Sequence, residues 1–347
     1  MNLKRLGWKE DTNLSLEGNQ KLARVTAVFK NKYKIHTGEE ELLADLKGNM
    51  IHAGLFPAVG DWVIVIDHLI LDILTRKSKI SRKVAGKTFD EQVIAVNIDY
   101  VFIVSSLNQE FNLSRLERYL TMVWESGANP VFLLTKSDIS DDFEEKTAQL
   151  EAIAYGVPIH VISSLQNIGL EELNKYFEND KTSVFIGSSG VGKSTLINKL
   201  IGKEVLVTKE IRENDGRGKH TTTHREMFFL ETHGIIIDTP GMREIQLWGG
   251  NLKNTFEDIE KLALNCKFRD CTHNEEPGCA VKKAIDTGLL AQKRFQNYKK
   301  LKRELEYETL NSRQLEVKKF ENMMGSFNES KAMRKFVKNK DKIKNKK

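Results

Sequence analysis

The chain of 347 residues has only 3 cysteines and 5 prolines, and it has no apolar run long enough to span a membrane. So few cysteines exclude a disulfide-stapled secreted domain. The missing apolar run excludes a predicted membrane helix. The first residues, "MNLKRLGWKEDTN", also lack the apolar core of a secretory signal. We therefore expect a cytoplasmic protein that is long enough for two or three domains.

Positive charge is concentrated at one end of the chain. Residues 331–347 hold nine Lys or Arg and one acidic residue, whereas the whole chain has a net charge of +6. The remainder is therefore nearly neutral. A basic tail of this kind suits a polyanion such as RNA, although a tail that only increases solubility is the alternative.

A glycine-rich turn lies between a predicted strand and a predicted helix in "SVFIGSSGVGKSTLINKL". It matches the phosphate-binding loop pattern at every fixed position. Backbone N–H groups of such a loop surround phosphate oxygens, the lysine reaches the β- and γ-phosphates, and the next hydroxyl binds Mg²⁺. The alternative is a strand–helix turn with a chance lysine. The predicted nucleotide-binding residues are Gly187, Ser188, Ser189, Gly190, Val191, Gly192, Lys193, Ser194 and Thr195, with Ser194 on magnesium.

Two further patterns stand at the ends of apolar strands, where parallel sheets bind ligands. One is Thr135-Lys136-Ser137-Asp138, whose carboxylate can accept two hydrogen bonds from guanine that adenine cannot donate in that arrangement. Ser163 and Ser164 end the next strand and could support the base. These residues predict GTP or GDP as the ligand.

The other pattern is Asp238-Thr239-Pro240-Gly241. An aspartate in this position can hold Mg²⁺ through water, and the amide of Gly241 can contact a γ-phosphate. Alone the tetrapeptide would be a weak signal, but here it accompanies a phosphate-binding loop.

The order of these motifs is unusual. In an ordinary GTPase the phosphate-binding loop comes first, whereas here the base-specificity residues precede it, which indicates a circularly permuted GTPase. The chain resembles the ribosome small-subunit-dependent GTPases of the RsgA/YjeQ family from about residue 22 to 300. The resemblance rests on the permuted order, "GSSGVGKST", "GKHTTT", "DTPGMRE" and a cysteine–histidine cluster. It implies that the protein binds the small (30S) ribosomal subunit and its 16S rRNA, and hydrolyses GTP as a switch in late subunit maturation.

The catalytic residues are less clear from the sequence. Met242 stands where Ras-like enzymes have a glutamine that orients the attacking water. We therefore expect slow intrinsic hydrolysis, with His220 as the best candidate to polarise the water and Lys193 on the phosphates. The alternative role of His220 is to order the switch loop. One of Thr221 to Thr223 should complete the magnesium shell, and we favour Thr222.

Three cysteines and a histidine lie within fourteen residues: Cys266, Cys271, His273 and Cys279. Three thiolates and an imidazole suit a closed tetrahedral Zn²⁺ site without a position for substrate. Buried thiols beside an unrelated histidine are the alternative. The resemblance to the family's zinc domain favours one structural zinc ion.

The remaining pattern predicts the fold. Short β-like segments from Leu22 onward predict a small barrel, OB-type or SH3-like. From Tyr100, apolar strands alternate with amphipathic helices, which predicts a mainly parallel sheet with helices on both faces. We expect an α/β P-loop GTPase core, circularly permuted, with an N-terminal all-β OB-like barrel and a C-terminal α-helical zinc domain. The predicted divisions are 1–20 (lead-in), 21–88 (barrel), 89–248 (GTPase), 249–325 (zinc domain) and 326–347 (basic tail).

Two other classes of protein stay open from the motifs alone. One is an ATP-using P-loop enzyme in which Asp138 does not contact the base. The other is an RNA-binding assembly factor whose nucleotide is bound but little hydrolysed. Nothing in the sequence requires more than a monomer.

Overall fold

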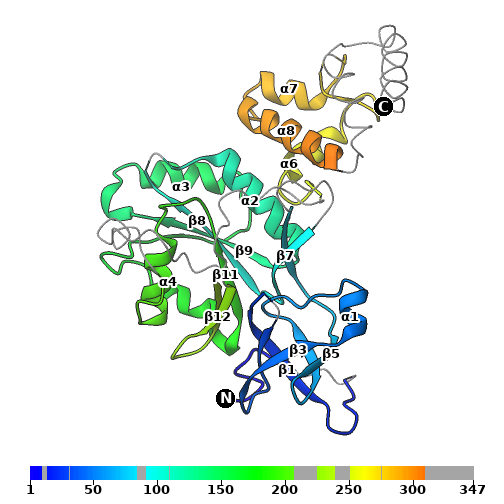
Figure 1. Cartoon of the computed structure of the whole chain (residues 1–347). Coiled ribbons are helices and arrows are strands. Elements are labelled where there is room, and N and C mark those ends of the chain that lie inside the picture. Colours follow the sequence, from blue (N-terminus) through cyan, green and yellow to red (C-terminus); the bar gives the residue numbers. More distant parts are fainter. Residues whose placement is uncertain are drawn as a thin grey trace, which may run out of the picture.

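A computed structural model describes residues 1–9, 14–30, 32–83, 91–108, 110–206, 225–238, 251–274 and 276–308. Within these ranges, eleven strands form one continuous sheet in the order β10-β9-β8-β11-β13-β12-β1-β2-β3-β5-β4. Figure 1 shows the barrel end of this sheet in blue, the larger α/β part in green, and a helical part in yellow and orange beyond it. None of the helices in the described ranges has the length and apolar character needed to cross a membrane.

The α/β core is built on five parallel strands and one antiparallel strand. β10, β9, β8, β11 and β13 run parallel, and β12 pairs antiparallel with β13. This confirms the mainly parallel sheet, although the sequence patterns did not predict β12. The strands are β8 (Tyr100–Ser106), β9 (Asn129–Thr135), β10 (Ile159–Val161), β11 (Thr182–Ile186), β12 (Arg225–Phe229) and β13 (Ile235–Asp238).

α-Helices follow β8, β9 and β11, as the alternating pattern predicted. α2 (Leu113–Ser126) begins at Asn112, whose side chain accepts a hydrogen bond from the backbone N–H of Arg115 at 3.0 Å. Such an N-cap satisfies one of the free N–H groups at a helix start. α3 (Phe143–Glu151) follows β9, and α4 (Lys193–Ile201) follows the glycine-rich turn.

The N-terminal barrel closes on itself through five strands. β1 pairs with both β2 and β4, and β3 pairs with β5. The five strands and the helix between β3 and β4 make it an OB-type barrel rather than an SH3-like one. The elements are β1 (Lys21–Val28), β2 (Tyr33–His36), β3 (Glu41–Leu46), α1 (Gly48–His52), β4 (Trp62–Ile66) and β5 (Leu69–Ile73).

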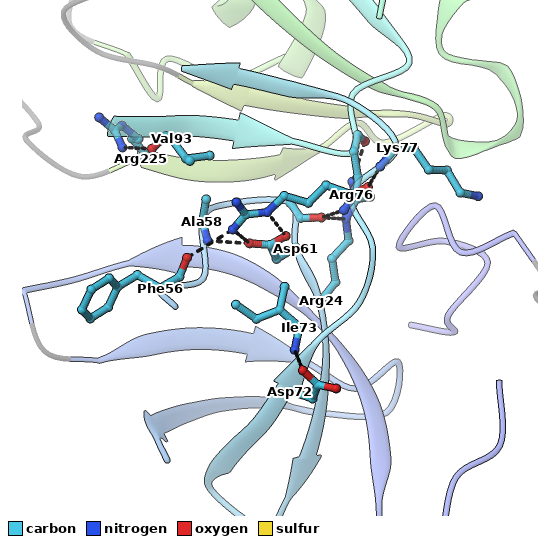
Figure 2. A network of polar contacts seen from close by, with 12 residues as sticks. Arg24, Phe56, Ala58, Asp61, Asp72, Ile73, Arg76, Lys77, Val93 and Arg225 are labelled. Carbon is cyan, nitrogen blue, oxygen red and sulfur yellow. Dashed lines mark hydrogen bonds and ion pairs between the residues drawn. The ribbon is translucent and has the colours of Figure 1, made fainter. Parts of the chain in front are cut away.

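The barrel is joined to the core by direct strand pairing. β1 pairs antiparallel with β12, so barrel and core share one sheet. A hairpin of β6 (Lys79–Lys83) and β7 (Glu91–Val96) lies against the same junction. There, Arg225 donates to the carbonyl oxygen of Val93 at 3.0 Å (Figure 2).

A fully buried carboxylate orders the barrel chain next to this junction. Asp61 is 0% exposed, and its carboxylate accepts from Arg76 Nε at 2.9 Å and from the N–H of Ala58 at 2.7 Å (Figure 2). The preceding Gly60 has φ +98°, and a Cβ there would lie 2.2 Å from the carbonyl oxygen of Val96. Only glycine therefore allows the barrel chain to approach β7 this closely.

The N-terminal segment is packed rather than detached. Leu6 is fully buried and lies with Leu22 and Trp62 in a small apolar cluster. Arg5 pairs with Asp180 of the core. The polar composition of the first residues did not indicate this packing, because a single buried leucine has no periodicity to read.

The C-terminal helices pack on α2 of the core. They are α6 (Glu257–Ala263), α7 (Ala280–Asp286) and α8 (Gln292–Glu308). Arg294 on α8 pairs with Glu117 on α2 at 2.5 Å and with Asp258 on α6 at 2.7 Å. The side chain of Glu117 is only 3% exposed, so this charged contact lies inside the interface between core and helices.

Candidate nucleotide and metal sites

The glycine-rich turn is a loop between β11 and α4. Gly187 has φ +148°, and a Cβ there would lie 2.2 Å from the carbonyl oxygen of Val104 on β8. A residue with a Cβ would clash there, so glycine is required where the chain passes this close to the neighbouring strand. Val191 is buried, while Ser189 and Gly190 are exposed at the tip of the loop.

The side chain of Lys193 lies along the inside of this loop. Its amine donates to the carbonyl oxygens of Gly187 at 2.7 Å and Ser188 at 2.6 Å. Ser194 and Thr195 follow in the first turn of α4 and are partly buried. The ammonium thus lies against the loop that leads into the N-terminus of α4, which suits a polyphosphate.

The guanine-specificity motif begins at the end of β9, two strands from β11. Thr135 is 2% exposed, and its hydroxyl donates to the carbonyl oxygen of Val191 in the phosphate-binding loop at 2.6 Å. Lys136 takes a left-handed conformation, φ +62°, before a short 3-10 helix over Ser137–Ile139. The predicted base and phosphate residues therefore lie at the same edge of the sheet.

Asp138 is held by the next predicted residue. The hydroxyl of Ser163 donates to Asp138 Oδ1 at 2.5 Å, and the Ser163 N–H bonds to the carbonyl oxygen of Ile168 at 3.1 Å. The hydroxyls of Ser137 and Ser164 are buried and have no hydrogen-bond partner within the described part of the chain. This cluster of carboxylate and hydroxyl groups suits the polar edge of a purine base.

Asp238 ends β13, which lies beside the strand of the phosphate-binding loop. Val184 of β11 is paired with Ile237, so Asp238 follows at the same edge as the loop. A carboxylate here can face a cation bound at the phosphates. Three other predicted residues, Gly241, His220 and Thr222, lie outside the described residues.

The four predicted zinc ligands converge. The three thiol sulfurs and a nitrogen of His273 all lie within 4.8 Å of one another. Cys266 Sγ is 3.6 Å from His273 Nδ1 and 3.9 Å from Cys279 Sγ, and Cys279 Sγ is 3.5 Å from the same nitrogen. Ligands of a tetrahedral zinc ion would be about 3.8 Å apart for two sulfurs and about 3.6 Å for sulfur and nitrogen. The residues therefore fit the ion, with Nδ1 as the imidazole ligand.

Local structure holds these ligands in place. Cys279 precedes α7, and its sulfur accepts from the N–H of Lys282 at 3.4 Å. Glu276 accepts from the N–H and hydroxyl of Thr272, at 2.8 Å and 2.5 Å, which closes the loop between the cysteines. These hydrogen bonds lower the pKa of Glu276 to about 2. Sequence reasoning did not find Glu276, since an exposed glutamate in a polar loop carries no pattern.

The fold and the arrangement of motifs define a class, the P-loop GTPases with circularly permuted order. The model of the RsgA GTPase family matches residues 73–248. The chain belongs to this family and is a GTPase, which implies a guanine nucleotide and Mg²⁺ as its ligands. The permuted GTPase predicted from the motif order is confirmed, and an ATP-using enzyme is not favoured.

Two relatives from bacteria cover most of the chain. It is 50% identical over 291 residues to the small ribosomal subunit biogenesis GTPase RsgA 2 of Listeria monocytogenes serotype 4b, which covers 82% of this chain and 83% of the relative. It is 44% identical over 322 residues to the protein of the same name from Lactiplantibacillus plantarum, covering 90% and 91%.

Two solved structures share the fold. The crystal structure of YjeQ from Thermotoga maritima has a TM-score of 0.61 at 29% identity and covers 82% of this chain and 98% of its own. That of YloQ, described as a circularly permuted GTPase, has a TM-score of 0.57 at 26% identity, covering 83% and 95%.

Proposed function

We propose that this GTPase binds the small ribosomal subunit and acts as a switch in its biogenesis, as the names of its relatives indicate for those proteins. The observation that supports this most is the 44% identity to such a relative over 90% of the chain and 91% of the relative. A ribosome-bound factor of this kind would act in the cytoplasm, as a monomer.

The nucleotide would lie across the edge formed by the ends of β8, β9, β11 and β13. Lys193 and the amides of the phosphate-binding loop would bind the phosphates, and Ser194 and Asp238 would hold Mg²⁺, directly and through water. Asp138 would accept from the guanine N–H groups, while the stem of Lys136 packs along the base. The nucleotide-binding residues that we propose are those predicted from the sequence: 135–138, Ser163, Ser164, 187–195, Asp238 and Gly241.

Hydrolysis requires a group that orients water opposite the leaving phosphate. Met242 cannot do this, so we propose His220 for the role, with Thr222 as a magnesium ligand. The rest of the positioning would come from the ribosomal subunit. Intrinsic turnover should accordingly be slow and should rise when the subunit binds.

The zinc ion would have an architectural role. With four protein ligands it has no open position for chemistry. It would hold the loop between α6 and α7 so that the basic helices and the tail reach 16S rRNA, while the barrel provides a second RNA contact. The division into lead-in, barrel, GTPase, zinc domain and tail at residues 20, 88, 248 and 325 belongs to this proposal.

Phosphate release from GTP and from ATP, with and without purified small subunits, tests this function. We expect slow turnover of GTP alone that increases strongly with subunits. A turnover rate that does not change when subunits are added would contradict the proposed partner but leave the GTPase activity. Equal affinity of the subunit for the GDP-bound and GTP-bound protein would contradict a switch. Tight GTP binding without turnover in any mixture would favour the RNA-binding factor.

A further inference from the structure

A single row of paired residues crosses the junction between barrel and core. Asp238 on β13 is opposite Glu226 on β12, Glu226 is opposite Ala27 on β1, and Ala27 is opposite Lys34 on β2. All three strand pairs are antiparallel. Residues directly opposite one another project from the same face of the sheet, with Cβ atoms about 4.5–5.5 Å apart. The row therefore leads from the barrel to the aspartate proposed for Mg²⁺.

The side chain of Lys34 bridges along this row. Its amine lies 3.5 Å from Glu226 Oε1 and 3.0 Å from Glu41 Oε1. Ala27, which lies between Lys34 and Glu226, has only a methyl group and leaves the path open. Burial of Lys34 favours the neutral amine, but Glu41 and Glu226 outweigh it and raise the pKa of Lys34. The bridging charge is thus present at neutral pH.

The charges in this row affect a cation at Asp238. Carboxylates directly opposite on neighbouring strands repel each other, and Glu226 faces Asp238 in this way. A divalent cation would be attracted by Glu226 and repelled by Lys34. The Lys34 and Glu226 side chains are 30% and 42% exposed, so solvent and salt weaken their effect on the cation but do not remove it.

We propose that Lys34 and Glu226 are positioning residues that set the magnesium affinity of the GTPase site by acting through Asp238. Glu226 increases the affinity for Mg²⁺, and Lys34, which the barrel contributes, reduces it. The barrel is then part of the electrostatics of the catalytic centre as well as a surface for other partners. This inference rests on the magnesium role proposed for Asp238.

Magnesium titration of the full-length protein with a fluorescent guanine nucleotide tests the proposal. We expect Lys34→Met to lower the magnesium concentration for half-maximal binding by about threefold, and Glu226→Gln to raise it by a similar factor. The double variant should return close to wild type, because both charges are removed. Lys34→Arg should behave as wild type because it keeps the charge.

Controls separate this effect from loss of structure. Lys32→Met removes an equal charge from the Lys32–Asp45 pair, which is 3.0 Å long and exposed on the same barrel. It should not shift the titration. The urea midpoint should stay close to that of the wild type in the Lys34 and Glu226 variants, whereas a merely structural role would move it.

The Asp238→Asn variant tests separately whether Asp238 holds Mg²⁺ and whether Lys34 and Glu226 act on that ion. If it weakens magnesium binding while Lys34→Met and Glu226→Gln behave as Lys32→Met does, the inference about the row is wrong and the proposed role of Asp238 stands. If Asp238→Asn titrates as wild type, Asp238 does not hold the ion and both are wrong. Shifts of the same sign in Lys34→Met and Glu226→Gln would also overturn the inference.

Discussion

The hydroxyl of Thr135 donates a hydrogen bond to the carbonyl oxygen of Val191, with 2.6 Å between the two oxygens. It joins the guanine-specificity motif to the phosphate-binding loop, although 56 residues separate them along the chain. Both groups are buried. Thr135 therefore links the two segments that we propose as the base-binding and phosphate-binding parts of the nucleotide site.

Replacing Thr135 by valine should weaken guanine-nucleotide binding. The change keeps the shape but leaves the Val191 carbonyl without this donor, which costs about 1–3 kcal/mol, and we expect about a tenfold rise in Kd for GDP. Thr135→Ser keeps the hydroxyl and should stay near wild type. Fluorescence titration measures both. Equal Kd values for the valine and serine variants would contradict the role of this hydrogen bond.

Asp138→Asn should remove the preference for GTP over ATP. The amide cannot accept both guanine N–H groups, and hydrogen bonds to a charged group contribute about 1.5–3 kcal/mol each, so the Kd for GTP should rise by about a hundredfold or more. Competition titrations with GTP and ATP report this. The Kd for ATP should not rise, and a variant that still prefers GTP would exclude Asp138 as the base-reading residue.

Ser163→Ala should weaken GTP binding less than Asp138→Asn does. It removes the hydroxyl that holds Asp138 Oδ1 at 2.5 Å but keeps the carboxylate. GTP affinity should fall by about threefold to tenfold, in line with one hydrogen bond of about 1 kcal/mol. Because the carboxylate remains, the preference over ATP should persist.

Zinc content should be one ion per chain, and removing it should unfold the loop between α6 and α7. The free energy of metal binding to such sites is also folding free energy. Cys271→Ser should reduce bound zinc, measured by elemental analysis, and should lower the far-ultraviolet helical signal. His52→Ser, an exposed histidine on α1, is the control and should keep the metal. A Cys271→Ser protein with full zinc content would contradict the assigned ligand set.

The buried pair at the core–helix interface makes stability depend on pH. Burial is the main cause that raises the pKa of Glu117 above 4.5, against the opposing attraction of Arg294. The folded protein therefore binds this proton more tightly than the unfolded chain does. The resulting stabilisation is complete below about pH 4.5 and is lost as pH rises through the folded-state pKa.

Glu117→Gln should remove that pH dependence. The difference in unfolding free energy between wild type and variant should fall as pH rises from about 4 through the higher pKa, and should then level off. Urea unfolding at several pH values measures it. Glu125→Gln, on the exposed side of the same helix, controls for the loss of a carboxylate. A pH-independent difference between wild type and Glu117→Gln would contradict the raised pKa.

Local patterns were sufficient for most of the core. The apolar runs that alternate with helices from Tyr100 onward predicted the parallel strands of the core, because fully buried strands need apolar side chains on both faces. The phosphate-binding loop was predictable for a similar reason, since its backbone geometry requires glycines at set positions. The cluster of three cysteines and a histidine was recognisable because its four members lie within fourteen residues.

Other features required the tertiary structure, because they depend on partners far away in the chain. β12 carries no clear alternation, and its position between β13 and β1 follows from strand pairing. The buried Arg294–Glu117 pair joins residues 177 positions apart. No local pattern encodes which charges meet.

The sequence by itself predicted the chemistry of this protein: a guanine-nucleotide site from short motifs, the permuted order of those motifs, and four candidate ligands for zinc. Only the tertiary structure decided how the parts are connected. Barrel and core became one sheet through the pairing of β1 with β12, which aligned Lys34 with Asp238. The physical reason is that motifs are fixed by backbone and side-chain chemistry over a few residues, whereas strand neighbours are chosen by the packing of the whole chain.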